Sequence, residues 1–237
     1  AARQKIPFGI AQIGKAFRNE ITPRNFTFRS REFEQAEMEF FVHPSERDQW
    51  FEYWRDERMR FHRDLGFSED VTRHRPHESD ELAHYAKAAV DVDFLFPFGW
   101  QEIEGIHDRG DWDLSRHGEF SGKDLGLTDE QTKERYTPMV IETSMGVDRT
   151  ALALLTDAYS EETLEGGESR TVLRFHPAIA PVKVALLPLS KKLAEPVHAL
   201  EADLRRHFNC FYDEAGNIGR RYRRQDEIGT PFCITYD

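Results

Sequence analysis

The sequence predicts an α+β fold, with paired strands and separate helices in a first region and a smaller α/β unit after it. Three observations indicate this. Residues 6–43 contain two strand-like segments around a turn, residues 45–66 have the apolar spacing of a helix, and strands alternate with helices after residue 182.

The first two predicted strands are unusual in their charge. They span residues 10–21 and 29–42 and are joined by a turn at residues 22–25. Side chains alternate along a strand, so one face of the second strand carries Arg29, Arg31, Phe33, Gln35 and Glu37, and the other carries Glu32, Glu34, Ala36, Met38 and Phe40. Neither face is plainly apolar. We therefore expect one face to meet a polar ligand or a water-filled cleft.

A helix follows the second strand. Apolar and aromatic residues recur at steps of three and four from residue 51 to residue 65 and end at Gly66, which predicts a helix packed on the core. Residues 67–80 are polar and predict a loop in which His74 and His77 are solvated. A second short helix is expected over residues 82–90.

Two carboxylates stand out in the strand that leads from residue 93 to residue 106. Glu102 and Glu104 alternate with Ile103 and are expected to share one face. This arrangement suits either a bound cation or a solvent-facing edge strand. Residues 107–135 are highly charged and rich in glycine, and they predict an excursion on the surface.

The next segment predicts a strand at residues 138–146 that turns into a helix at residues 147–159. Asp148 suits the positive end of a helix. Arg149 at the same end costs a few tenths of a kcal/mol to about 1 kcal/mol unless an anionic ligand compensates its charge. From spacing alone, Arg149 is either an anion ligand or an ordinary surface arginine.

The last third of the chain predicts a linker at residues 160–170 and a second domain from about residue 177. Its expected elements are strands at 182–187, 210–212 and 231–236, a helix at 194–208 and a turn with a helix at 217–226. Alternation of this kind is typical of an α/β domain.

Composition narrows the class of protein. The 237 residues are 39% hydrophobic and contain no apolar run of about 18 residues, which predicts a soluble, cytoplasmic protein without a membrane segment. The net charge of −11 argues against nucleic-acid binding by bulk charge, although a local basic patch is compatible with it. Cys210 and Cys233 lie far apart, so we expect neither a disulfide nor a zinc site. The first residue is not Met and the sequence stops within a strand-like run, which suggests a fragment.

Two motifs resemble those of class II aminoacyl-tRNA synthetases. Residues 17–20 and 29–33 resemble motif 2, and residues 142–149 resemble motif 3. Together with residues 102–106 between them, they are similar to glycyl-tRNA synthetases of the homodimeric type. The resemblance implies a class II catalytic core with an antiparallel sheet at residues 1–176 and the first part of an anticodon-binding domain at 177–237. It also implies ATP-dependent glycine activation, transfer of glycine to tRNA(Gly) and a homodimer.

The resemblance further implies an ATP site. Its members would be Arg18, Asn19, Glu20, Phe28, Arg29, Ser30, Arg31, Glu32, Phe33, Glu102, Ile103, Gly146, Val147, Asp148 and Arg149. The catalytic pair would be Arg18, on the α-phosphate and the attacking carboxylate, and Arg149, at the other end of the triphosphate. Arg29 would contact the γ-phosphate, Phe33 would stack on adenine and Glu20 would accept the adenine amino group. Little covalent chemistry is needed from side chains here, so arginine and a divalent metal are the expected tools.

A glycine site is implied next to the ATP site. Its members would be Phe33, Glu34, Gln35, Ala36, Glu37, Glu142, Thr143, Ser144, Met145 and Gly146. Carboxylates at Glu37 and Glu142 would bind the ammonium group, and larger amino acids would be excluded by a filled space. Magnesium would arrive with ATP and be held by Glu102 and Glu142.

A basic cluster in the second domain predicts tRNA contacts. Its arginines are Arg220, Arg221, Arg223 and Arg224, and the alternative for them is a solvated helix face. Motif 1, which forms much of the family's dimer interface, and an upstream glutamate segment that binds glycine would precede Ala1.

Three other functions fit parts of the pattern. One is a synthetase-like binding module without catalysis, the second is another class IIa synthetase, and the third is an amino-acid ligase that forms an adenylate without tRNA. The phosphate-binding arginines disfavour the first, and the attached α/β domain disfavours the third. The segments at residues 33–37 and 102–106 favour glycine over the other class IIa substrates.

Overall fold

The computed structural model describes residues 4–78, 80–82, 86–129 and 132–237. The chain forms two compact units, one from residues 1–63 and 68–153 and the other from residues 64–67 and 154–237. Each unit is described by itself below. Within the described ranges, no helix combines the length and the apolar character needed to cross a membrane.

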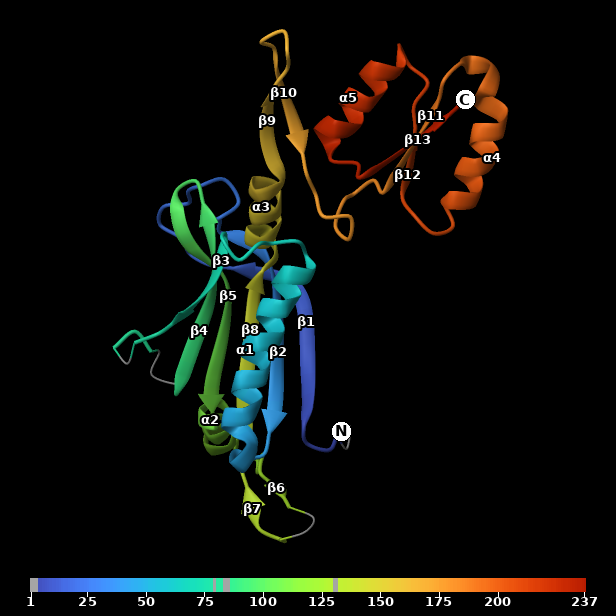
Figure 1. The fold of residues 1–237 in the computed structure, drawn as a ribbon. Helices are drawn as coiled ribbons and strands as arrows, with labels where there is room; N and C mark the ends of the chain where they lie inside the picture. Colours follow the sequence, from blue (N-terminus) through green and yellow to red (C-terminus); the bar gives the residue numbers. More distant parts are fainter. Residues whose placement is uncertain (1–3, 79, 83–85, 130–131) are drawn as a thin grey trace. The chain divides into compact units, whose positions relative to one another are not determined.

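The first unit is built on a six-stranded antiparallel sheet (Figure 1). The strands, in spatial order, are β1 (Phe8–Phe17), β2 (Glu32–Val42), β8 (Met139–Gly146), β5 (Gly99–Gly110), β4 (Ala88–Phe96) and β3 (Thr72–Pro76). Strand β8 lies between β2 and β5, so the sheet brings the ends of β2, β5 and β8 together although they are separated in the chain. The predicted antiparallel class II sheet is confirmed.

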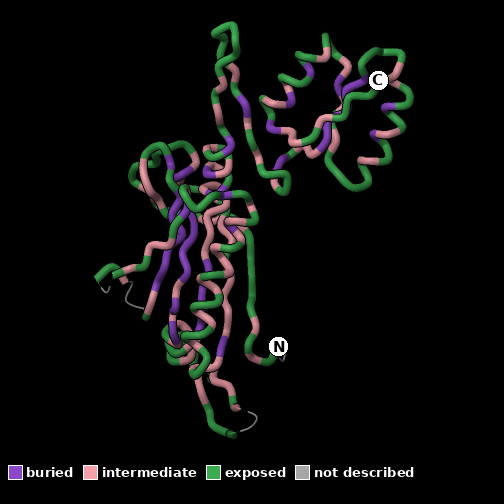
Figure 2. Tube along the Cα trace, in the orientation of Figure 1, coloured by how far each residue is buried: buried purple, intermediate pink, exposed green. Residues whose placement is uncertain are grey.

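The core lies along the central strands, and β1 is an exposed edge (Figure 2). The helix α1 (Arg47–Asp64) follows a short 3-10 turn, η1 (Pro44–Glu46), and covers one face of the sheet. On that face the Phe40 ring contacts Trp50 and Trp54, with centroid distances of 4.8 and 5.2 Å. The aromatic stripe of the helix therefore packs on the sheet, as predicted.

The remaining elements of the first unit lie at the ends of the sheet. They are α2 (Trp112–Ser121), the small hairpin of β6 (Leu127–Thr128) and β7 (Arg135–Tyr136), and the start of α3 (Val147–Ala158). The predicted strand-to-helix junction at residues 146 and 147 is confirmed.

Several predictions of local structure in the first unit are wrong. The predicted loop at residues 67–80 contains β3, because residues 72–76 pair with β4. No helix spans residues 82–90, because Ala88–Val90 begin β4; residues 83–85 of that prediction lie outside the described part. The surface excursion begins only after Gly110, and Asp108, 2% exposed, is buried within β5. His74 and His77 are not solvated: His77 pairs with Asp91 at 2.9 Å, and the ring of His74 contacts the Arg55 carbonyl at 3.2 Å.

The strands at the start of the chain are shorter than predicted, and a loop of residues 18–31 separates them. The strand ladder ends at the pair Phe17 and Glu32, and the Arg18 amide donates to the Arg31 carbonyl at 2.9 Å to close the loop. Residues 24 and 29 form an isolated bridge inside it. Arg29 and Arg31 therefore lie on this loop and not on the alternating face of β2.

A β-bulge separates Glu102 from Glu104, so the prediction that they share one face is wrong. Glu102 lies opposite Asp93 on β4, whereas Glu104 lies opposite Val92. Asp93 and Val92 are consecutive and point to opposite faces, and their partners do the same. Glu104 is buried against α1, where it accepts from Arg58 Nε at 2.5 Å and meets His62 Nε2 at 2.7 Å.

The second unit contains a hairpin and a parallel three-stranded sheet. The hairpin strands are β9 (Tyr159–Thr163) and β10 (Ser169–Leu173), so the predicted linker at residues 160–170 is wrong. The sheet has the order β12 (Cys210–Tyr212), β11 (Val184–Pro188), β13 (Phe232–Tyr236). The 3-10 turn η2 (Lys191–Leu193) and the helices α4 (Ala194–Leu204) and α5 (Ile218–Ile228) connect these strands, which confirms the predicted α/β alternation. Both cysteines are free thiols.

Candidate active site

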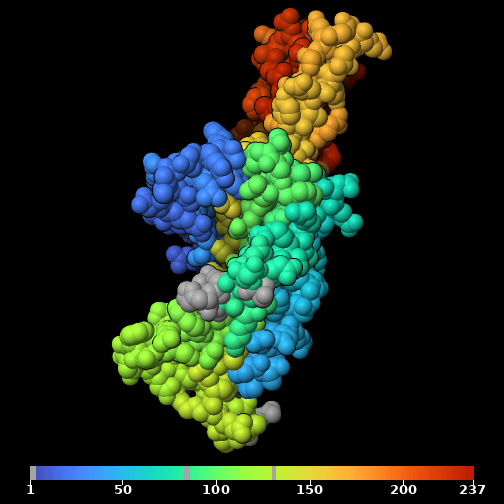
Figure 3. All heavy atoms as spheres, turned by 90° about the vertical axis from the view of Figure 1, so that its left-hand side faces the viewer, coloured from blue at the N-terminus to red at the C-terminus, as the bar shows by residue number. Residues whose placement is uncertain are grey.

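A pocket of about 520 Å³, counting its open mouth, lies where the 18–31 loop meets the ends of β2, β5 and β8. Figure 3 shows the blue atoms of the loop on one side and the green atoms of the β4–β5 turn on the other. The lining residues are Arg18, Glu20, Thr27, Phe28, Arg29, Ser30, Phe33, Glu34, Gln35, Glu102, Ser144, Gly146, Asp148 and Arg149. All of them except Thr27 belong to the predicted ATP and glycine sites.

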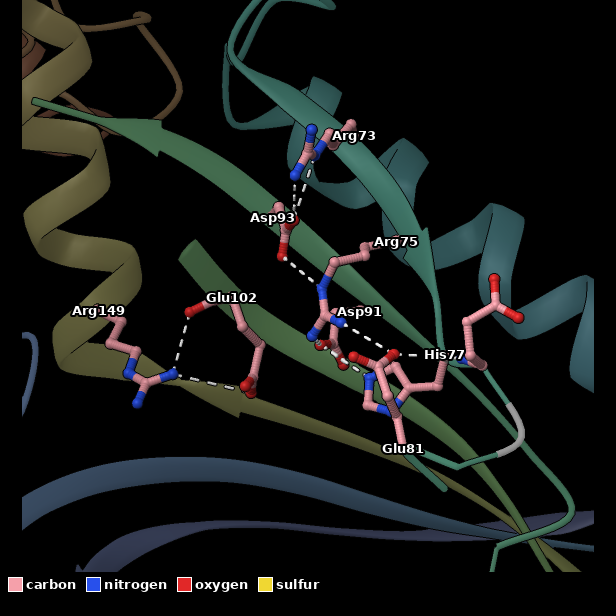
Figure 4. A network of polar contacts seen from close by, with 9 residues as sticks. Arg73, Arg75, His77, Glu81, Asp91, Asp93, Glu102 and Arg149 are labelled. Atoms are coloured by element: carbon pink, nitrogen blue, oxygen red, sulfur yellow. Dashed lines mark hydrogen bonds and ion pairs between the residues drawn. The ribbon is translucent and has the colours of Figure 1, made fainter. Parts of the chain in front are cut away.

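Three guanidinium groups face this pocket, from Arg18, Arg29 and Arg149. Arg149 lies in the first turn of α3 and donates from Nε to the Phe28 carbonyl at 3.0 Å. Its Nη1 donates to the Glu102 carbonyl, also at 3.0 Å (Figure 4). Burial lowers the pKa of Arg149, and the charges of Arg18 and Arg29 lower it further against the opposing effect of Glu102. Positive charge gathered at a helix N-terminus is suited to a bound anion.

Aromatic rings position two of these guanidinium groups. The Arg149 guanidinium carbon lies 4.3 Å from the centroid of the Phe28 ring, and that of Arg18 lies 5.3 Å from the Phe33 centroid. Phe28 is 4% exposed and packs edge-on against Phe96 and Phe98, each at 5.4 Å. A fixed ring restricts the arginine above it, so Arg149 is held before any ligand arrives.

Acidic groups join segments within the loop, and another joins β2 to α3. Glu20 accepts from Arg29 Nη1 at 3.2 Å, and its backbone carbonyl accepts from Arg31 Nε at 3.0 Å. Asp148, in the first turn of α3, accepts from the Glu34 amide at 2.6 Å. These bonds give the 18–31 loop a defined conformation around the pocket.

Three residues of the predicted glycine site form a cluster of side chains on β2 and β8. Gln35 Nε2 donates to Glu37 Oε1 at 2.9 Å and to Ser144 Oγ at 2.5 Å, and the hydroxyl lies 3.4 Å from the same carboxylate. Glu37 lies opposite Ser144 in the ladder, so both project from the face away from α1. A carboxylate beside a hydroxyl and an amide can bind an ammonium group.

Several predicted site residues lie away from the pocket. Ala36, Thr143 and Met145 alternate with Gln35, Ser144 and Gly146, so they face α1, and Met145 Sδ contacts Arg58 Nη2 at 4.0 Å. Glu32 pairs with Lys15. The remaining predicted members that do not line the pocket are Asn19, Arg31, Ile103, Val147, Glu37 and Glu142.

Glu142 is not placed to hold the predicted metal. It is 9% exposed, accepts from Arg109 Nη1 at 2.6 Å and does not line the pocket. Burial raises the pKa of its cross-strand neighbour Glu39 to about 7, and the Glu142 charge adds to this. Glu102, with 47% of its side chain exposed, does face the pocket, 3.8 Å from Arg149 Nη1.

Sequence reasoning missed three residues beside this site, namely Glu39, His107 and Arg109. They lie on the face that carries Glu37 and Glu142, beyond the pocket. Alternation along β2 could have identified Glu39. The other two were assigned to a surface excursion, and only an extension of the strand to Gly110 would have placed them on this face.

The basic cluster on α5 divides into structural and exposed groups. Arg221 is 5% exposed and donates to the backbone carbonyls of Pro188 and Gly216. This buried guanidinium does not support the predicted tRNA contact of Arg221. Arg224 pairs with Asp213 at 2.6 Å but stays 42% exposed, and Arg223 is 47% exposed. Arg220 is exposed on the first turn of the helix.

Known protein families and relatives resemble this chain in sequence. The class II core domain of tRNA synthetases for G, H, P, S and T matches residues 1–159, and an anticodon-binding domain matches residues 183–237. The chain is 58% identical over 236 residues to the glycine–tRNA ligase of Lachnospira eligens and 60% identical over 235 residues to that of Clostridium tetani. These alignments cover 100% and 99% of the chain but 51% of each relative, so the chain spans about half the length of the curated relatives it matches.

A solved structure shares the fold. The prolyl-tRNA synthetase of Giardia lamblia, in complex with prolyl-adenylate, superposes with a TM-score of 0.74 over 97% of this chain and 46% of that chain. The two sequences are 17% identical, so this similarity concerns the fold alone.

Proposed function

Because this chain belongs to the class II tRNA synthetases, we propose that it carries out glycine–tRNA ligation as part of a protein of its relatives' length. A carboxylate oxygen of glycine attacks the α-phosphorus of ATP, the bond to the β-phosphate bridge breaks, and pyrophosphate leaves. The 3′ end of tRNA(Gly) then attacks the carbonyl carbon of glycyl-adenylate, and AMP leaves. The observation that carries the proposal is the convergence of three arginines and two aromatic rings beside the cluster of Gln35, Glu37 and Ser144.

The ATP end of the pocket suits a bound triphosphate. Arg18, whose guanidinium lies over the Phe33 ring of β2, would hold the α-phosphate with the attacking carboxylate, while Arg149 would hold the far end of the triphosphate. Guanidinium groups bind phosphate oxygens through two parallel hydrogen bonds. Arg29 leaves Glu20 in this scheme, which frees the carboxylate of Glu20 for the adenine amino group; Phe33 stacks on the base.

The residues present also fit a magnesium ion brought in by ATP. Magnesium is usually held by one or two carboxylates together with phosphate oxygens. Glu102 supplies one exposed carboxylate at the pocket, next to the arginine assigned to the triphosphate. When bound, the ion would neutralise charge that develops on the phosphate oxygens. We leave Glu142 out of this role, because its carboxylate pairs with Arg109 at 2.6 Å.

The glycine end suits a small amino acid. The ammonium group would bind Glu37 and Ser144, and its carboxylate would point along β2 toward Arg18. We do not assign Glu142 a direct contact, but its charge lies on the same face of the sheet and adds to the negative potential.

Contacts with tRNA are proposed for the second unit. The match to an anticodon-binding domain supports them, and the exposed guanidinium groups of Arg220, Arg223 and Arg224 could bind phosphates. A homodimer and a cytoplasmic location follow from the family resemblance alone and stay predictions.

The test of the function is ATP–pyrophosphate exchange by the full-length protein with each of the twenty amino acids, without tRNA. Exchange with glycine alone supports the proposal. Exchange with proline, serine, threonine or histidine would move the assignment within the class II synthetases, and no exchange at all would favour a binding module.

Two substitutions test the assigned roles. Arg18→Ala or Arg149→Ala should reduce glycine-dependent exchange by about 100-fold or more, because each removes a preorganised charge at the phosphates. Arg116→Ala, at an exposed arginine on α2, is the matched control and should leave exchange unchanged. Near-normal exchange by both active-site variants would refute the roles given to them.

A further inference from the structure

His107 lies on β5, on the same face of the sheet as the cluster of Gln35, Glu37 and Ser144. It is two residues after Gly105 on β5, and both project from the same face of the sheet. A Cβ atom placed on Gly105 would lie 2.5 Å from His107 Cε1, so the imidazole ring lies directly above this glycine. Only a residue without a side chain fits beneath the ring.

Gly105 is the cross-strand neighbour of Ser144 on one side and of Asp91 on the other. Ser144 therefore has Glu37 on its β2 side and the ring of His107 on its β5 side. Adjacent strands are about 4.8 Å apart, so a group bound at Ser144 lies within contact distance of the ring. The imidazole of His107 thus occupies the β5 side of Ser144, opposite Glu37.

Neighbours on both sides hold the ring in place. On the β8 side, His107 Nδ1 is 3.9 Å from the Glu142 carboxylate, which Arg109 fixes. On the β4 side, the His77 ring meets His107 edge-on with a centroid distance of 6.3 Å. Glu142 and His77 therefore flank the His107 ring on two sides.

Figure 4 shows a polar network around His77, whose ring is the neighbour of the His107 ring. Asp91, 2% exposed, pairs with His77 at 2.9 Å and also with Arg75, and Arg75 reaches Asp93 at 3.7 Å. Arg73 pairs with Asp93 in turn, at 3.1 Å. These ion pairs connect β3 and β4 and do not reach the pocket. We therefore assign them the role of positioning His77 beside the His107 ring.

We propose that the His107 imidazole is a specificity-determining wall, which excludes amino acids with a side chain from the glycine cluster. The inference rests on the proposed function. An ammonium group bound at Glu37 leaves the substituents of the α-carbon to project toward β5, where the ring lies. Hydrogen fits in that space, and a methyl group overlaps with the ring.

The experiment compares glycine with alanine in ATP–pyrophosphate exchange by the full-length protein. In His107→Ala, the ratio of kcat/KM for glycine to that for alanine should fall by about 10-fold or more, on the scale that one methylene contributes to discrimination. His107→Phe retains a ring of similar width and should keep the ratio within about threefold of the wild type. His117→Ala, at an exposed histidine on α2, is the control and should not change the ratio.

Each outcome bears on one of the two proposals. Equal losses with both amino acids in His107→Ala, at an unchanged ratio, would overturn the inference and leave His107 a structural role, while glycine exchange by the wild type would still support the function. Absence of glycine exchange by the wild type would refute the function and the inference together. If His107→Ala does not fold, as judged by circular dichroism, His107→Asn also removes the ring and is interpreted in the same way.

Discussion

Substitution of Glu39 by glutamine should remove a pH-dependent loss of stability from the first unit. Glu39 lies on β2 opposite Glu142, and burial raises its pKa from 4.5 to about 7, with the Glu142 charge as the next cause. In the unfolded chain the carboxyl has its ordinary pKa. Below pH 4.5 the Glu39 carboxyl is protonated in both the folded and the unfolded state, so it does not lower the free energy of unfolding. Between pH 4.5 and about 7 the unfolded chain ionises more readily, so the folded protein loses stability as the pH rises.

The size of this loss follows from the two pKa values. Each pH unit between them corresponds to about 1.4 kcal/mol, which gives an upper limit of about 3 kcal/mol above pH 7. Water reaches part of the side chain and screens the charge, so we expect about 1 to 3 kcal/mol. Glutamine has the same shape and does not ionise, so the variant should lack this contribution.

The assay is urea unfolding of the wild type and of Glu39→Gln at pH 5 and at pH 8. The difference in free energy of unfolding between the variant and the wild type should be about 1 to 3 kcal/mol larger, in favour of the variant, at pH 8 than at pH 5. Glu69→Gln, at an exposed loop residue, is the control and should follow the wild type at both. If Glu39→Gln also follows the wild type, the carboxyl ionises normally in the folded protein and the reasoning fails.

Other substitutions test the buried charges and the basic cluster. Arg58→Met removes the guanidinium that pairs with the buried Glu104 and should lower the free energy of unfolding by about 3 to 5 kcal/mol in urea titrations; a loss below about 1 kcal/mol would contradict the pairing. Arg221→Met leaves two backbone carbonyls without their donor and should cost about 1 to 3 kcal/mol in the same assay, whereas Arg220→Met should change stability by less than about 0.5 kcal/mol. If Arg220 binds a tRNA phosphate, its substitution should reduce the slope of log affinity against log salt by about one in filter-binding measurements; an unchanged slope would remove it from the interface.

The pairing of Glu104 shows why a sequence pattern can mislead near a functional site. Two glutamates separated by one residue imply a common face only if the strand is regular. The bulge between them places Glu104 under α1 and Glu102 at the pocket. No feature of residues 101–106 alone predicts the bulge, because it depends on the pairing with β4.

The same limit applies to the loop of residues 18–31. Its sequence alternates well enough to predict a continuation of β2, yet the ladder stops at Glu32. Contacts that the loop makes with distant residues stabilise the alternative conformation, above all the hydrogen bond from Arg149 to the Phe28 carbonyl. Local preference for a strand is worth less than such tertiary contacts.

The sequence by itself determined the α+β class, the strand-to-helix junction before Arg149 and the α/β alternation of the second unit, because these depend on periodicity and on local helix and turn residues. The resemblance to class II synthetase motifs named all but one of the residues that line the pocket. Only the tertiary structure decided which face each side chain takes, that Glu142 pairs with Arg109, that Arg221 is buried and that the ring of His107 lies over Gly105. Such features depend on strand pairing between residues far apart in the chain, which no local pattern encodes.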